Sequence, residues 1–215
     1  MSRHESMVAK TVIMLSLQDD MNSLVNDDWR ERQREWYRAI WIECAELMDH
    51  YGGWKWWKHS TPDIEQSTLE LVDIWHFGLS MYLEAYNDYE SAAEDIVTQW
   101  QAAAGAGEFL AEVEVLASAA VERKTFSVTS VCNLMTLLDH DFDDLYRAYI
   151  GKNVLNTFRQ DHGYKSGEYH KDWNGKEDNE VLVEVLTSLD SDSKTFRDEL
   201  YRAHDDRYQS VVATN

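Results

Sequence analysis

The sequence predicts an all-α fold, a multi-helix bundle in which a metal-binding carboxylate cluster lies between two central helices. A single proline, nine glycines and long stretches of helix-forming residues favour helices along the whole chain. No stretch resembles alternating βαβ units. At 215 residues the chain can bury a sizeable core. We therefore expect a single domain over residues 1–215, with a peripheral helical insertion at about 87–138.

Two helices are expected at the start of the chain, with an acidic residue as the N-cap of the second. One helix runs over about 7–26, where apolar residues recur. Asp27 or Asp28 can cap the next helix, which carries Trp29 and ends at Gly52. The second helix would then include the whole run WIECAELM.

Thr61 and Pro62 are typical of an N-cap and a first helical residue, so a third helix is expected from there to about Tyr86. An acidic and aromatic stretch follows and ends in the turn AAAGAGEF. The remaining helices are expected over about 108–123, 128–138 and 141–158, with two short ones between 180 and about 208. They complete a bundle of six or seven helices.

Two pairs of acids stand in the second and third helices. Glu43 and Glu46 interrupt one apolar run, and Glu70 and Asp73 interrupt another. A step of three residues keeps both acids of a pair on one helix face, so antiparallel packing would bring four carboxylates together. Like charges in apolar surroundings require protons or cations, and oxygen ligands favour Mg²⁺, with Mn²⁺ or Ca²⁺ as substitutes. The alternative is that the acids line the wet edges of two amphipathic helices.

A histidine beside the second pair suggests another metal chemistry. His76 follows Asp73 by three residues, which imitates half of the acid-x-x-His motif of di-iron bundles. The second half is missing, because Glu43 is followed by Glu46 and then Asp49. We therefore expect His76 in the core or behind the metal ligands.

The second informative stretch is basic. Residues 147–176 hold six Lys or Arg against three acids, a balance of +3 in a chain whose net charge is −20. Steps of three and four place Lys152, Asn153, Asn156 and Arg159 on one helix face. A glycine-rich, aromatic loop to residue 179 follows and can close on an anion. The alternative is an ordinary basic helix end followed by a polar loop, which is common in proteins. Together with the acid pairs, however, the basic stretch favours a phosphorylated substrate that is bridged between a cation-holding half and an anion-holding half.

The overall charge excludes other classes of protein. A chain of net charge −20 lacks the basic face that binding to nucleic acid or to an anionic membrane requires. The longest apolar run is too short to span a membrane, and the start MSRHESMVAK lacks the apolar core of a signal peptide. We therefore expect a cytoplasmic protein in which Cys44 and Cys132 are reduced core residues.

Four blocks occur in order between residues 14 and 179: MLSLQDDMN, IECAELMDHYGGWKWWK, ELVDIWHF and KNVLNTFRQDHGYKSGEYHKDWNGKEDN. In these blocks the sequence resembles the dimeric all-α dUTP diphosphatases (dUTPases), part of the all-α nucleoside triphosphate pyrophosphatase superfamily. The resemblance implies a homodimer that hydrolyses dUTP, and also dUDP, to dUMP with Mg²⁺. This activity limits uracil in DNA and supplies dUMP. Residues 87–138 carry no matching motif.

The resemblance also implies roles for individual residues. The four acids Glu43, Glu46, Glu70 and Asp73 would hold Mg²⁺, and Glu46 would be the base that deprotonates water. The substrate-binding residues would fall into three groups. Gln18 and Asn22 would read the uracil edge; Trp54, Lys55 and Phe77 would line the pocket, with Phe77 against the deoxyribose; and Lys152, Asn153, Asn156, Arg159, Tyr164 and Lys165 would grip phosphates or complete the sugar pocket.

Three other functions remain open from the residues alone. A pyrophosphatase of the same superfamily could act on another deoxynucleotide such as dCTP, because Gln18 and Asn22 carry the uracil prediction almost alone. A non-catalytic acidic helical interaction module would show exposed acids along one face and no response to Mg²⁺. A di-iron carboxylate protein would contain iron and needs the second acid-x-x-His.

Overall fold

The computed structural model describes residues 1–105, 107–190, 193 and 195–212. In these residues nine α-helices and one π-helical turn form, and no strand is present apart from an isolated bridge between Asp172 and Glu177. The predicted all-α fold is confirmed. The chain divides into two compact units, Met1–Tyr146 and Arg147–Asn215, which are described one at a time.

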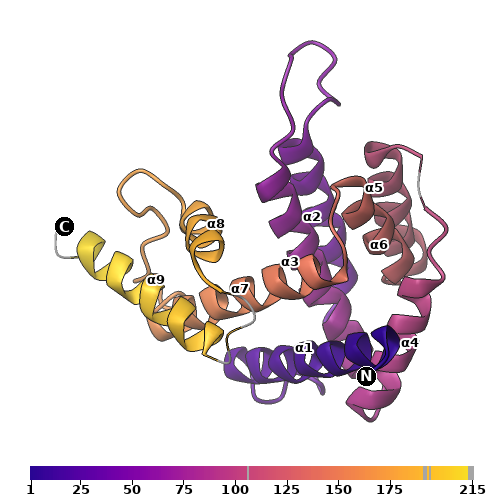
Figure 1. Cartoon of the computed structure of the whole chain (residues 1–215), viewed down its shortest axis with the longest axis horizontal. Helices are drawn as coiled ribbons and strands as arrows, with labels where there is room; N and C mark the ends of the chain where they lie inside the picture. The colour runs from indigo at the N-terminus through magenta and orange to yellow at the C-terminus, as the bar shows by residue number, and fades with distance from the viewer. Residues whose placement is uncertain (106, 191–192, 194, 213–215) are drawn as a thin grey trace. The chain divides into compact units, whose positions relative to one another are not determined.

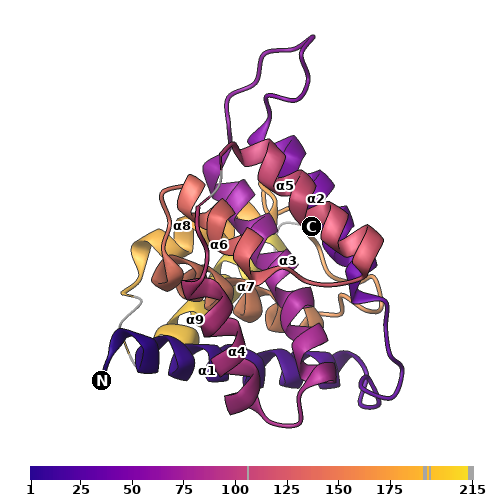
Figure 2. The same ribbon diagram turned by 90° about the vertical axis from the view of Figure 1, so that its right-hand side faces the viewer.

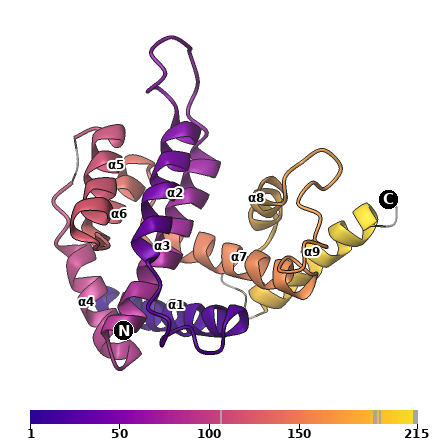
Figure 3. The same ribbon diagram turned by 180° about the vertical axis from the view of Figure 1, so that it is seen from behind.

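The first unit contains most of the helices. They are α1 (Arg3–Val25), α2 (Trp36–Tyr51), α3 (Ile64–Ala85), α4 (Tyr89–Gln101), α5 (Phe109–Ser118) with its π-helical continuation (Ala119–Arg123), α6 (Val128–Leu137) and the start of α7 (Phe142–Asp161). The most extensive helix contact is between α2 and α3, which run side by side (Figure 1). The loop between them extends beyond the ends of both helices (Figure 3).

Helix α3 is the centre of this unit because its sequence is apolar nearly all round. Leu71, Ile74, Trp75 and Leu79 are fully buried. α2 and α6 pack against α3, α4 lies against α1, and α5 lies against α2 (Figure 2). The indole of Trp75 meets Trp100 of α4 edge-on, with ring centroids 5.8 Å apart. The central segment thus contributes to the core of the first unit.

The start of α2 differs from the prediction. Residues 27–32 form turns, residues 33–35 have no regular structure, and α2 begins at Trp36, so neither Asp27 nor Asp28 caps it. The reason is tertiary: the buried indole of Trp29 donates to Asp19 Oδ1 of α1 at 3.1 Å, which holds the segment against α1. A helix through these residues would have to give up this anchor.

The start of α3 also differs. The helix begins at Ile64, and its N-cap is Asp63 rather than Thr61. The Asp63 carboxylate accepts the backbone N–H of Gln66 at 3.1 Å, which satisfies one of the free amides of the first turn. A carboxylate also complements the positive end of the helix dipole.

The second unit contains the rest of α7 with α8 (Asp178–Ser188) and α9 (Phe196–Val212). α9 has 17 residues, so it is not the short helix that was predicted. Phe158 of α7 lies in an aromatic cluster with Tyr201 and Tyr208 of α9, at centroid distances of 5.3 and 5.4 Å. These rings form the core that fixes α9 on α7.

Two further predictions concern the cysteines and the absence of a membrane-spanning helix. Cys44 and Cys132 are buried and unbridged, as predicted. Burial, with the nearby charge of Glu43, raises the pKa of Cys44 to about 12, so this thiol stays protonated at neutral pH. Among the described helices, none combines the length and the hydropathy that a membrane crossing requires.

A close approach of α3 to Phe126 gives a test of this packing. A Cβ added at Gly78 would collide with the Phe126 ring. We expect Gly78→Ala to lower the free energy of unfolding by about 1–3 kcal/mol, because the overpacking outweighs the helix propensity gained. Denaturant unfolding measures this. Gly107→Ala is the control, since no atom lies within 4 Å of its added Cβ. Equal stability of both variants would contradict the packing.

Candidate functional site

An acid cluster lies between α2 and α3. Glu43 and Glu46 of α2 and Glu70 of α3 each offer a carboxylate oxygen, and these oxygens lie within 4.8 Å of one another. Glu70 is buried, Glu43 is half-buried and Glu46 is exposed. Asp73 is half-buried on α3 and acts electrostatically on Glu43. The two acid pairs are thus brought together by the packing of the two helices.

The cluster strongly favours an added positive charge. Burial and the charges of Asp73 and Glu70 raise the pKa of Glu43 to about 8, so without a cation this carboxyl holds a proton at neutral pH. A divalent cation can take the place of that proton. The donors are all carboxylate oxygens, which suit a hard cation such as Mg²⁺. The residues present therefore fit a metal centre.

The surroundings of the acids are less apolar on α2 than the sequence suggested. α2 buries only Ile40, Cys44 and Leu47, whereas Trp41 and Ile42 are 39% and 42% exposed. The alternative that the acids line the solvent-exposed edges of amphipathic helices therefore describes Glu46 but not Glu70. The cluster has a closed side formed by α3 and an open side formed by α2.

Two residues near the cluster were given no role from the sequence. His50 Nε2 lies 3.6 Å from Glu70 Oε1. Asp49 accepts the Trp54 indole N–H at 3.2 Å and forms an ion pair with Lys55, whose ammonium lies 4.8 Å from the centre of the Trp54 ring. The step from Glu46 to Asp49 repeats the three-residue spacing of the acids, and this pattern was the available signal.

The two amides predicted to bind the base lie in a buried polar network. Gln18 Nε2 donates to Asn22 Oδ1 at 2.9 Å and to Ser80 Oγ at 3.2 Å, and Asn22 Nδ2 donates to the same hydroxyl at 3.0 Å. His76 Nδ1 donates to Gln18 Oε1 at 2.6 Å. The amides are not surface residues, and His76 is a core residue that orients Gln18. Ser80 follows His76 by one helical turn.

Phe77 is half-buried on α3, four residues after Asp73. Its ring stacks on the indole of Trp36, the first residue of α2, with centroids 6.2 Å apart and planes at 28°. Trp36 follows a loop that was predicted to be helical, so no sequence pattern paired these two residues.

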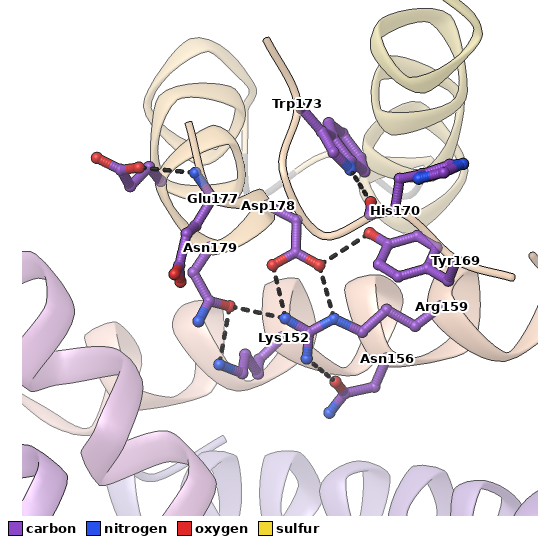
Figure 4. Close-up of polar contacts among 10 residues, drawn as sticks. Lys152, Asn156, Arg159, Tyr169, His170, Trp173, Glu177, Asp178 and Asn179 are labelled. Atoms are coloured by element: carbon purple, nitrogen blue, oxygen red, sulfur yellow. Dashed lines mark hydrogen bonds and ion pairs between the residues drawn. The ribbon is translucent and has the colours of Figure 1, made fainter. Parts of the chain in front are cut away.

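The predicted anion-binding residues of the second unit form a network of their own (Figure 4). Arg159 Nε and Nη2 each donate to the Asp178 carboxylate at 2.8 Å, and Arg159 Nη1 donates to Asn156 Oδ1 at 3.1 Å. Asn179 Oδ1 accepts from Lys152 at 3.0 Å and from Arg159 at 3.3 Å. Lys152 and Arg159 are buried, with exposed fractions of 2% and 8%.

The carboxylate of this network is neutralised inside the protein. Asp178 also accepts the hydroxyl of Tyr169 at 2.8 Å. Burial opposes its ionisation, but the hydrogen bonds and charge of Arg159 outweigh burial and hold the pKa of Asp178 below its usual range. No role was given to Asp178, Tyr169 or Asn179 from the sequence, although all three lie in the last of the four blocks.

The other predicted residues of this unit lie around the network. Asn153 is buried, and its Oδ1 accepts from Arg197 of α9 at 3.4 Å. Tyr164 is 43% exposed, and the Arg159 guanidinium lies 5.8 Å from the centre of its ring. Lys165 is exposed. These residues belong to the second unit, whereas the acid cluster belongs to the first.

A comparison with protein-family models assigns the chain to a family. The family model described as dUTPase, the all-α type, matches residues 10–164. The match spans both acid pairs, both buried amides and the basic face of α7, and it ends before Asp178. A comparison with curated proteins gives no match.

The buried ion pair of the second unit predicts a large stability effect. We expect Asp178→Asn to lower the free energy of unfolding by about 3–5 kcal/mol at pH 7, because a buried guanidinium loses its counter-charge. The pKa of Asp178 is lowered in the folded state, so its contribution is present above the ordinary pKa and is lost as pH falls through the folded pKa.

The difference in stability between the wild type and Asp178→Asn should therefore shrink below about pH 4. Denaturant unfolding across pH measures this difference. The control is Glu184→Gln, since Glu184 forms exposed ion pairs with Lys176 and Arg207 and should change stability little. Equal losses in the two variants would contradict the importance of the buried pair.

Proposed function

The chain belongs to the all-α dUTPase family, and we propose that it hydrolyses dUTP to dUMP and pyrophosphate with Mg²⁺ held between α2 and α3. Family membership makes it a dUTP diphosphatase. The dependence on Mg²⁺, the identity of the products and the use of dUDP, which would give dUMP and phosphate, are parts of the proposal. The observation that carries it is the convergence of carboxylate oxygens from two helices.

The metal ligands proposed are Glu43, Glu46, Glu70 and Asp73. Three of them already offer oxygens within 4.8 Å of one another, and the raised pKa of Glu43 reflects a deficit of positive charge at this point. Mg²⁺ bound there, or Mn²⁺ in its place, would neutralise the triphosphate and make water easier to deprotonate. The closed side formed by Glu70 and α3 keeps these ligands fixed.

Glu46 is the base in this proposal. It is the exposed member of the cluster, so its carboxylate is accessible to water. Glu46 accepts a proton from a water whose oxygen attacks phosphorus, the bond between the α- and β-phosphates breaks, and pyrophosphate leaves. Glu43, with its raised pKa, is less suited to accept that proton until a cation is bound.

The nucleoside would lie further along the same two helices. Gln18 and Asn22 are proposed to read the uracil edge, for which their amides supply both donors and acceptors. Both are buried and bonded to α3, so the base must exchange some of these hydrogen bonds for its own. Phe77 is proposed to press on the deoxyribose and to exclude a 2′-hydroxyl. Trp54 and Lys55, held by Asp49, would line the pocket.

The second unit is proposed to bind phosphates and to complete the sugar pocket. The network around Arg159 fixes the cationic face of α7 before substrate arrives. Such preorganisation lowers the entropy lost on binding. The residues proposed for this role are Lys152, Asn153, Asn156, Arg159, Tyr164 and Lys165.

A homodimer in the cytoplasm is also part of the proposal. The apolar side chains that α2 exposes, Trp41 and Ile42, support a second copy of the chain as partner. Two unbridged buried cysteines support a reducing compartment. The deoxyuridine nucleotide would be the substrate, and the net charge of −20 argues against direct binding of nucleic acid or an anionic membrane.

Substrate choice gives the main test. We expect Mg²⁺-dependent release of pyrophosphate from dUTP, little from dCTP, dTTP or UTP, and none with EDTA. A coupled pyrophosphate assay measures all four. Release from dCTP instead of dUTP would keep the metal centre and favour the related deoxynucleotide pyrophosphatase. No release from any nucleotide would favour the acidic interaction module, and bound iron would favour the di-iron protein.

Two variants test the acid cluster. We expect Glu46→Gln and Asp73→Asn to lower kcat by about 10³-fold or more, because a ligand or the base is lost. Their stability without metal should equal or exceed that of the wild type, since each removes a like charge. The matched control is Asp95→Asn on α4, an acid outside the cluster. Full activity in either cluster variant would remove that residue from the mechanism.

A further inference from the structure

We propose that Trp36 is a positioning residue for sugar discrimination, which it exerts by holding the ring of Phe77 in place. This inference rests on the proposed role of Phe77 against the deoxyribose. Trp36 lies outside the four sequence blocks, in a position where a helix interior was predicted and a helix start is found. Its effect on the substrate would pass through Phe77.

The register of the two helices places Trp36 along the line of the substrate. In α2, Trp36 precedes Glu43 by seven residues, and in α3, Phe77 follows Glu70 by seven. Seven residues are nearly two helical turns, so both aromatic residues lie on the faces that carry the acids, roughly 10 Å along the axis. Because the helices run antiparallel, both steps lead away from the acid cluster in the same direction. Trp36 and Phe77 meet there.

The contact between the rings is a stack rather than a chance approach. The centroids are 6.2 Å apart and the planes differ by 28°. Offset stacking of this kind contributes beyond the area that it buries. Phe77 is only half-buried, so core packing alone does not fix its ring. The indole of Trp36 is therefore the surface that stops Phe77 from swinging away from a sugar.

Trp36 is itself held by two contacts. Its indole N–H donates to Glu84 Oε1 at 2.9 Å, and Trp29 meets its ring edge-on at a centroid distance of 6.1 Å. Trp29 is anchored to Asp19 of α1. Trp36, Met81 and Glu84 also line a cavity of about 760 Å³, so these directed contacts, rather than dense packing, orient the indole.

Steric exclusion of a hydroxyl needs a ring that cannot yield. If Phe77 can rotate, the space for a 2′-hydroxyl opens and UTP is accepted, while the phosphates still reach the acid cluster. Loss of Trp36 should therefore change the choice between sugars more than the rate on dUTP.

The experiment compares kcat/KM for dUTP and UTP. We expect Trp36→Leu to lower the dUTP to UTP ratio by about 10-fold or more, mainly through faster use of UTP, and Trp36→Phe to keep most of the ratio. Tyr37→Leu is the control, because Tyr37 is the next aromatic residue and its ring faces the cations of Arg38 and Lys124. It should leave the ratio unchanged.

A double-variant cycle separates positioning from a general structural effect. Phe77→Ala should lower the ratio, and adding Trp36→Leu to it should lower the ratio by less than a further twofold. A ratio that stays within twofold of the wild type in Trp36→Leu, with both substrates affected in parallel, would overturn the inference. So would independent effects of the two substitutions.

Two outcomes concern the proposed function and folding. If the wild type hydrolyses neither nucleotide, or does not discriminate between them, the proposed function fails and this inference fails with it. A normal wild-type ratio that Trp36→Leu leaves unchanged contradicts the inference alone. If Trp36→Leu does not fold, Glu84→Ala releases the indole N–H and keeps the ring. We then expect a smaller fall in the ratio, and an unchanged ratio overturns the inference.

Discussion

The repulsion among carboxylates held between α2 and α3 is the constraint on which the proposed function of this molecule depends. Packing of the two helices fixes acids that would separate if they were free, and the result is a carboxyl group, Glu43, whose pKa rises to about 8. The buried side of α3 supplies the rigidity, since Leu71, Ile74 and Trp75 are fully buried. A fold that holds like charges together in this way is prepared for a cation.

The second unit buries positive rather than negative charges. It buries the cations Lys152 and Arg159, and the counter-charge comes from within, because Asp178 takes both donors of one edge of the guanidinium. The acid cluster concentrates charges of one sign, whereas in this network Asp178 pairs with Arg159 and the Asn179 amide oxygen accepts from both cations. We infer that the first is a centre that binds by charge and the second a scaffold that presents polar groups in fixed directions.

Between the acid cluster and the buried amides, aromatic contacts hold the side chains in place. The segment between α1 and α2 is tied to α1 by Trp29, and it leads to Trp36, which stacks on Phe77. In the proposed function, one face of α3 carries, in order, acids for the phosphates, a ring for the sugar and, through Ser80, the amides of α1 that would bind the base. This order matches the order of phosphate, sugar and base in a nucleotide.

The sequence by itself determined the helical class, the two acid pairs, the basic face of α7 and the family, because helix periodicity and short motifs depend on residues close together in the chain. Only the tertiary structure decided the start of α2, the burial of Gln18 and Asn22 under Ser80 and His76, and the pairing of Arg159 with Asp178. Each of these rests on a contact between residues far apart in sequence, whose free energy overrides local preference. An acidic N-cap predicted a helix through residue 29, whereas the structure ties this segment to α1 through the buried Trp29 indole and through Arg30, both of which bond Asp19.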